Sequence, residues 1–291
     1  MGQFEKLSSH NNEIGLWENG ASRCIVKAYR GKPLTLKRIK YSAMHLLGMN
    51  VPIEYRPARC RREFERKCLR FWATRGFLVP EEVPHPAGHS ERGVSLAMSF
   101  LDGITLDAYL RDETRSPQDK WDVLDTVFQD LRDRHLLAIS DEDYRLIHFD
   151  SNMRNIIVTE DGPARVDFEM GRPRERIDRS AQREVKKLVL EIANALGEES
   201  LVELIARLYS HYGILEVING MANAELDRRF PGVHRIRDAR RKRRRPGLVT
   251  KLDLARAVRD KATQGNPPDV NPAHDPKSPK QNGKSTGDIH E

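Results

Sequence analysis

The sequence has only three cysteines, Cys24, Cys60 and Cys68, and no two of them have Cys-x-x-Cys spacing. An odd number of cysteines without that spacing argues against a disulfide scaffold and against a zinc site. No apolar run approaches the roughly 18 to 20 residues that a helix needs to cross a bilayer. The first residues also lack the apolar segment of a secretory signal. We therefore expect a reducing, cytoplasmic location.

What the sequence does contain is charge. Of its 291 residues, 38% are hydrophobic and 32% are charged, with a net charge of +7. This apolar content suffices for a real core, in one two-lobed domain or in two small ones. This net charge and the isoelectric point near 9.3 favour an anionic partner.

The basic excess is concentrated in residues 235–245, where RIRDARRKRRR has eight basic residues and one Asp in eleven positions. Such density favours contact with anionic lipid head groups, and RNA is the less favoured alternative. A solvated cationic helix would also have this composition. From Gln264 onward, Pro, Asn, Lys, Gly and Ser dominate, which predicts a disordered tail over 264–291.

The most informative stretch spans residues 146–169 and reads LIHFDSNMRNIIVTEDGPARVDFE. Two apolar, β-prone segments, 156–158 and 164–166, are joined by residues that include the turn signal Asp-Gly-Pro, so we expect a hairpin. Polar side chains stand before its first strand and after its second, and should meet at one end. They are Asp150, Asn155 and Asp167.

These residue types suit phosphoryl transfer. That chemistry needs a carboxylate to orient and deprotonate the attacking hydroxyl, and oxygen ligands that hold Mg²⁺ against the phosphates. The patterns His-x-Asp-x₄-Asn over 148–155 and Val-Asp-Phe-Glu over 166–169 resemble the catalytic loop and the metal-binding motif of the protein-kinase-like superfamily. By this resemblance, Asp150 would accept the proton of the acceptor hydroxyl, and Asn155 and Asp167 would hold Mg²⁺.

The resemblance implies an α+β, two-lobed fold with a small β-rich N-lobe, a compact helical C-lobe and use of ATP with Mg²⁺. Two departures point away from typical eukaryotic protein kinases. Glu169 stands where they carry Gly, and Ser151-Asn152 follow Asp150 without their usual Lys. Both favour the small atypical kinases and the sugar kinases.

Residues 13–29 predict two strands around a turn of small polar residues. Lys27 lies mid-strand among apolar neighbours, where a lysine is costly unless it finds an anion. In a kinase-like fold it would meet the α and β phosphates of ATP, whereas at an edge strand it would face solvent. The turn has one glycine only, but backbone donors of Gly20, Ala21 and Ser22 could cover phosphates.

Residues 59–75 predict a helix, with apolar side chains at helical spacing. In a kinase-like fold its glutamate pairs with the strand lysine, and both Glu63 and Glu65 compete for that role. Glu65 is preferred because it lies at the edge of the apolar face. The spacing of Glu65, Gly76 and Pro80 also resembles that of the lipopolysaccharide-core sugar kinases. For either glutamate, a solvated helix face is the alternative.

Residues 93–103, GVSLAMSFLDG, predict a buried strand that runs into a turn. The segment resembles the connection between kinase lobes, which binds the adenine edge through backbone groups. The resemblance implies that Met98 lies behind the base and that Ser99 and Leu101 offer backbone contacts. An ordinary core strand would have the same composition.

The remaining periodic segments predict helices, the fourth of which has Ser180 as its N-cap and ends at Gly197. Their ranges are 35–48, 105–111, 117–135, 180–196, 199–213, 214–227 and 248–262. We assign 1–103 to the N-lobe and connecting strand, and 104–263 to the C-lobe with its basic segment.

Among kinase-like families, the lipopolysaccharide-core (Kdo/heptose) kinases fit best. The resemblance implies transfer of the γ-phosphoryl of ATP to a sugar hydroxyl of an anionic, lipid-linked glycan, with peripheral contact at the inner face of the cell membrane. An atypical serine/threonine protein kinase uses the same three residues and stays open. So does a non-catalytic nucleotide- or RNA-binding scaffold, although degenerate kinases typically lose one of Asp150, Asn155 and Asp167.

Overall fold

The structure is a computed structural model that describes residues 3–8, 12–20, 22–30, 41, 44, 53–86, 94–171, 175–227 and 231–265. The helix predicted over 35–48 lies outside the described residues, apart from 41 and 44. Ala21 and residues 266–291 of the predicted tail also lie outside them.

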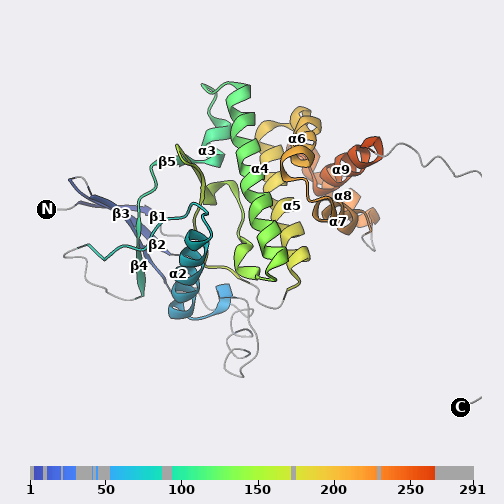
Figure 1. Ribbon diagram of the computed structural model, residues 1–291. Coiled ribbons are helices and arrows are strands. Elements are labelled where there is room, and N and C mark those ends of the chain that lie inside the picture. Colours follow the sequence, from blue (N-terminus) through green and yellow to red (C-terminus); the bar gives the residue numbers. More distant parts are fainter. Residues whose placement is uncertain are drawn as a thin grey trace, which may run out of the picture.

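The N-terminal lobe is an antiparallel sheet with the strand order β1-β2-β3-β4. Its strands are β1 (Gln3–Ser8), β2 (Glu13–Asn19), β3 (Ser22–Ala28) and β4 (Ser95–Ser99). Helix α2 (Ala58–Thr74) lies between this sheet and the helical lobe (Figure 1). The predicted β2–β3 hairpin is confirmed, whereas β1 was not predicted because its sequence has only two large apolar residues.

The two faces of β3 have different surroundings. Cys24 and Val26 pack with Ala97 in a small cluster of their own. Ile25 and Lys27 point to the opposite face and line a pocket between the lobes. The alternation of β3 therefore places one lysine on the face that meets the rest of the molecule.

The C-terminal lobe is helical, and its principal elements follow the chain (Figure 1). They are α3 (Leu106–Arg111), α4 (Pro117–Ser140), α5 (Ile177–Leu196), α6 (Leu201–Arg207), a π-helical turn (Leu208–Tyr212), α7 (Leu215–Leu226), α8 (Pro231–Arg244) and α9 (Lys251–Gly265). Short 3₁₀ turns span Ile53–Tyr55, Tyr144–Leu146, Met153–Asn155 and Glu198–Ser200.

Two helix boundaries differ from the sequence predictions. Helix α5 begins at Ile177, and Ser180 is a buried residue inside it instead of its N-cap. Helix α9 continues to Gly265, so Gln264 is helical and does not begin the tail. The C-terminal end of α5 is as predicted, because Gly197 takes the positive φ of 101° that a glycine adopts at low cost.

A second sheet, β5-β6-β7, lies where the lobes meet. It consists of β5 (Gly103–Thr105), β6 (Ile156–Thr159) and β7 (Gly162–Arg165). The predicted hairpin is β6–β7, with Thr159 opposite Gly162, so its turn is shorter than the five residues expected. Gly103 pairs with Thr159, and a Cβ on it would come within 2.3 Å of the Val158 carbonyl oxygen. The predicted lobe boundary at 103/104 thus falls inside β5.

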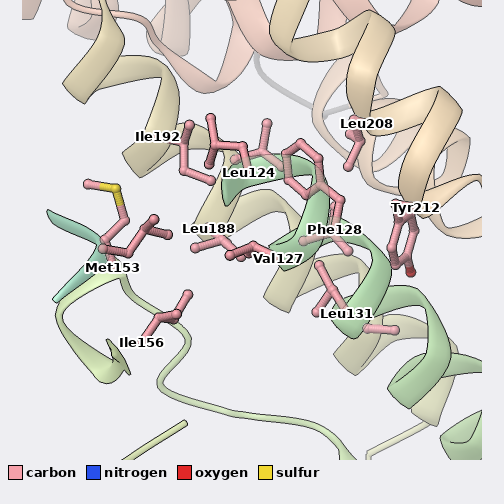
Figure 2. Packing of buried hydrophobic residues seen from close by; sticks show 14 of the residues in the cluster. Leu124, Val127, Phe128, Leu131, Met153, Ile156, Leu188, Ile192, Leu208 and Tyr212 are labelled. Atoms are coloured by element: carbon pink, nitrogen blue, oxygen red, sulfur yellow. The ribbon is translucent and has the colours of Figure 1, made fainter. Parts of the chain in front are cut away.

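The core of the helical lobe is built from α4 and α5. Figure 2 shows Leu124, Val127, Phe128 and Leu131 of α4 packed near Leu188 and Ile192 of α5. Met153, from the loop before β6, and Ile156, the first residue of β6, pack into the same cluster. Apolar contacts therefore fix the polar loop of residues 148–155 to the core.

This arrangement confirms the predicted α+β, two-lobed, protein-kinase-like fold, with a small antiparallel N-lobe sheet and a helical C-lobe. Over the described residues, no helix combines the length and the apolar content that a membrane span requires.

Candidate active site

A pocket of about 310 Å³ lies between the lobes, within the range of small-molecule sites. Its apolar lining comes from both lobes and includes Ile14, Ile25, Met98, Leu101 and Ile157. Its polar lining includes Lys27, Glu65, Asn155 and Asp167. An apolar slot with polar groups at one side can take a flat base and a charged tail.

Lys27 is the buried cation in the lining of this pocket. Its side chain is 2% exposed, and its Nζ donates to Glu65 Oε2 at 2.7 Å and to Asp167 Oδ1 at 2.6 Å. Burial alone lowers the pKa of Lys27, but the attraction of these two carboxylates outweighs it, so the pKa lies above its usual value. Lys27 therefore remains charged.

Glu65 joins α2 to the residues around Asp167. Besides Lys27, its carboxylate accepts hydrogen bonds from the Tyr29 hydroxyl at 2.5 Å and from the Phe168 N–H at 3.2 Å. Burial raises the pKa of Glu65, and Lys27 opposes this effect. Glu63 instead lies near Arg66, at 3.7 Å, and its side chain is 44% exposed. The lysine partner is thus Glu65.

Asp167 has an unusual backbone. Its φ of 67° lies in the left-handed region, which costs a non-glycine residue about 1–3 kcal/mol. The next residue fixes this conformation, because the Phe168 ring lies against Trp72 and His148, with centroids 4.6 and 4.8 Å away. Strain held in this way is typical of functional positions.

Glu169, two residues after Asp167, is 6% exposed and accepts hydrogen bonds from two other parts of the chain. It accepts from Arg61 Nη1 of α2 at 2.6 Å and from Asn12 Nδ2, before β2, at 2.8 Å. Arg61 is 1% exposed and also donates to the Arg30 carbonyl. Glu169 therefore ties the segment after Asp167 to α2 and to the N-lobe sheet.

Asp150 and Asn155 lie together on the loop before β6. Asn155 Nδ2 donates to the Asp150 carbonyl at 2.9 Å, and the Asn152 side chain accepts from the N–H groups of Arg154 and Asn155. Asp150 Oδ1 accepts from Lys187 Nζ of α5 at 2.5 Å. Lys187 of α5 thus contacts the carboxylate of Asp150, whose own loop contains no lysine.

One stripe of α5 contacts this loop at three levels. Glu184 accepts from the His148 N–H at 2.9 Å, Lys187 contacts Asp150, and Glu191 accepts from the Met153 N–H at 3.1 Å. Spacings of three and four residues place these side chains on one helix face. The loop is therefore held by charged groups of α5 as well as by apolar packing.

His148 connects the loop to the strand that precedes Asp167. Its Nε2–H donates to the Val166 carbonyl at 2.9 Å, and the side chain is buried. Burial lowers the pKa of His148 to about 4, despite the nearby Glu184 carboxylate. The neutral ring is thus the stable form near neutral pH.

The predicted nucleotide contacts fall into two groups. Met98, Ser99 and Leu101 line the pocket, and the Ser99 N–H donates to the Glu81 carbonyl at 2.8 Å. Gly20 and Ser22 do not line it in the described part of the chain, and Ala21 lies outside that part. Their contact with phosphates stays a prediction.

The pocket offers two donors that suit Mg²⁺, the Asn155 amide and the Asp167 carboxylate. The described residues contain no group of three or more His, Cys, Asp and Glu that could hold a metal. A two-donor set nevertheless fits Mg²⁺, which usually keeps several waters and binds through one or two side chains together with substrate phosphates.

Sequence reasoning missed Lys187, Arg61 and the partners of Glu169. Their pairs join residues 37 to 157 positions apart, which no local pattern encodes. One signal for Lys187 was present in the sequence. Residues 184, 187 and 191 are charged and share one helix face, while the positions that follow them are apolar.

The fold is protein-kinase-like, and between its lobes the buried Lys27 and Glu65 lie in contact with the partly exposed Asp167. No protein-family model and no curated protein matches the sequence. Among solved structures, the chain is similar to the kinase domain of PknI from M. tuberculosis, with 14% identity and a TM-score of 0.42, over 89% of this chain and 94% of that one.

Proposed function

We propose that this protein is an ATP- and Mg²⁺-dependent phosphotransferase that moves the γ-phosphoryl group of ATP to a hydroxyl. The observation that supports this most strongly is the contact of Lys27 with both Glu65 and Asp167, in a pocket that Asn155 also lines. A nucleotide-binding scaffold without catalytic activity would not need Lys27, Glu65, Asp167 and Asn155 together.

On the nucleotide side, the adenine lies in the apolar slot between Ile25 and Ile157, beside Met98. Lys27 binds the α and β phosphates. Asn155 and Asp167 hold Mg²⁺, which when bound offsets the negative charge of the phosphates. The pocket volume and its two-sided lining support this orientation.

On the acceptor side, Asp150 accepts the proton of the attacking hydroxyl. The acceptor oxygen forms a bond to the γ-phosphorus, the bond to the β–γ bridging oxygen breaks, and ADP leaves with the electron pair. Lys187 keeps the Asp150 carboxylate oriented and contributes a positive charge beside the transferred group. Most of the rate gain comes from positioning and electrostatics, so no covalent nucleophile is required.

We infer that the acceptor is a sugar hydroxyl of an anionic, lipid-linked glycan of the lipopolysaccharide-core type, met at the inner face of the membrane. The basic helix α8 supports an anionic partner. A serine/threonine protein acceptor would use the same Asp150 and Lys187.

The test is incubation with γ-labelled ATP and Mg²⁺, with separate glycolipid and protein fractions as acceptors. We expect label in the glycolipid fraction, and none when Mg²⁺ is chelated. Label in protein alone would replace the sugar acceptor with a protein one. Absence of transfer to any acceptor, with no ATP bound, would contradict the phosphotransferase proposal.

A further inference from the structure

A second pocket, of about 470 Å³, lies on the α5 side of the catalytic loop. Residues 152–154 of the loop form one wall, and Lys187 and Glu191 of α5 form another. Arg154 lines this pocket and the pocket between the lobes, so the two adjoin at that residue. Lys187, through its contact with Asp150, joins the second pocket to the proposed base.

The lining of this pocket is cationic. It contains the four basic residues Arg111, Arg154, Lys187 and Arg245, against the two acidic residues Asp107 and Glu191. Asp107 is shared by two of the arginines, with Arg111 Nε at 2.9 Å and Arg154 Nε at 3.7 Å. Among the described residues, no side chain pairs with the guanidinium of Arg245. Positive charge is therefore left over inside the pocket.

Arg245 reaches the pocket from the end of the basic helix, and its position is fixed from both sides. Before it, Lys242 binds Asp253 of α9 at 2.8 Å and Glu198 at 3.1 Å. After it, Asn194 of α5 exchanges two hydrogen bonds with the Val249 backbone, at 3.0 and 3.1 Å. The wall formed by Arg245 and Leu248 is thus built into the fold.

We propose that this pocket binds the acceptor alcohol through a phosphate or carboxylate group that the acceptor already carries. The inference rests on the proposed phosphotransferase function and names the substrate class of that site. An anionic group held by Arg245 and Arg111 leaves a nearby hydroxyl of the same molecule to reach Asp150 past Lys187. Guanidinium groups suit such anions because their paired N–H donors match the oxygens of phosphate and carboxylate.

Binding of glycerol 3-phosphate, compared with glycerol, tests the pocket without ATP. We expect the phosphate to bind at least about tenfold more tightly than glycerol, equivalent to one strong charge-assisted contact. Arg111→Gln/Arg245→Gln removes two charges from the pocket and should weaken this binding about tenfold or more. The matched control, Arg240→Gln/Arg241→Gln, removes two exposed charges from the same helix region and should leave it unchanged.

Vesicles of phosphatidylglycerol present a glycerol phosphodiester at a lipid surface and so distinguish a lipid source from a free phosphate, with phosphatidylcholine as the neutral comparison. Stronger loss of glycerol 3-phosphate binding in the Arg111/Arg245 variant than in the control supports the pocket. Equal binding of glycerol 3-phosphate and glycerol, or equal loss of glycerol 3-phosphate binding in both variants, overturns it. Because these measurements omit ATP, a protein that binds the probe and transfers no phosphate would contradict the proposed function and leave the pocket assignment intact.

Discussion

At the scale of single residues, the distinctive feature is the lysine that contacts Asp150. It comes from α5 and follows Asp150 by 37 residues, whereas a lysine in the loop itself is absent. The adjacent Lys186 points elsewhere and pairs with Glu225. This neighbour offers a control on the same helix.

Lys187→Met should lower kcat by about 10²-fold with little change in the KM for ATP, because one preorganised charge beside the reacting group is worth about 10²- to 10³-fold. Lys187→Arg should recover much of the rate, and Lys186→Met should leave it within about twofold of the wild type. Steady-state kinetics with labelled ATP measure all three. Equal losses in the two Met variants would reduce Lys187 to a structural residue.

Glu169 is the second residue-scale feature. Glu169→Ala leaves Arg61 buried without its carboxylate, so we expect a loss of about 3–5 kcal/mol in the free energy of unfolding. Glu203→Ala, which removes an exposed partner of Arg207, should cost less than about 1 kcal/mol. Urea denaturation compares them, and similar values for the two variants would show that the Glu169 contacts contribute little.

Local patterns were enough to single out Asp150, Asn155 and Asp167, since all three lie within 18 positions of one another; their catalytic roles stay predictions. Lys27 was identifiable because a mid-strand lysine among apolar neighbours needs an anion. The choice of Glu65 over Glu63 came from its place on the helix face. Lys187 and Arg61 were out of reach, because contacts between distant helices and loops depend on the tertiary arrangement.

At the scale of elements, α2 is the connection between the lobes. Its Trp72 is fully buried, donates from Nε1 to the Arg145 carbonyl at 2.7 Å, and packs against Phe168 and His148. Glu65 and Arg61 on the same helix hold Lys27 and Glu169. One helix thus positions both Lys27 and the segment that contains Asp167 and Glu169.

His148, in the polar loop of residues 148–155, should make stability depend on pH. Because the pKa of His148 is about 4 in the folded protein and its ordinary value is 6.5, the folded protein binds fewer protons than the unfolded chain between these two pH values. The contribution of neutral His148 to the free energy of unfolding is therefore fully present above about pH 6.5. It is lost as the pH falls toward 4, by on the order of 3 kcal/mol.

His148→Gln keeps a donor for the Val166 carbonyl and removes this titration, so its stability should decline less over the same pH range. Urea denaturation at several pH values measures the difference. His211→Gln, at a partly exposed histidine, should retain the wild-type decline. Parallel declines in the wild type and in His148→Gln would assign the acid sensitivity to other groups.

Some helices and strands could be predicted from the sequence, and others could not. The helices with clear apolar stripes and the β2–β3 and β6–β7 hairpins follow from periodicity and turn residues. Strands β1 and β5 are short and gain their stability from pairing, Gly103 with Thr159 for example, which sequence periodicity does not reveal. The N-terminus of α5 was misplaced because Ser180 resembles a cap but is buried in the helix.

At the scale of the whole molecule, the basic helix α8 should decide where the protein works. Replacing Arg240, Arg241, Arg243 and Arg244 by Gln spares Lys242, which pairs with Asp253. Each cation near an anionic surface contributes about 1 kcal/mol, so binding to anionic vesicles should weaken strongly while transfer to a soluble acceptor persists. Wild-type binding should also fade as salt shortens the Debye length to about 8 Å at physiological strength.

The same variant separates the two anionic partners. RNA gives a similar salt dependence, so vesicles and RNA are compared at matched ionic strength. We expect a preference for vesicles. A preference for RNA would contradict the membrane-facing glycan acceptor and favour an atypical protein kinase.

The central claim is that Asp150 and Asp167 divide the work of phosphoryl transfer, and one comparison of their variants tests it most directly. ATP binding and Mg²⁺-dependent transfer are measured for both. Asp150→Asn should bind ATP normally and transfer phosphate about 10²- to 10⁴-fold more slowly, as for a lost proton acceptor. Asp167→Ala should fold and lose Mg²⁺-dependent transfer. Undiminished transfer in Asp167→Ala would contradict the account.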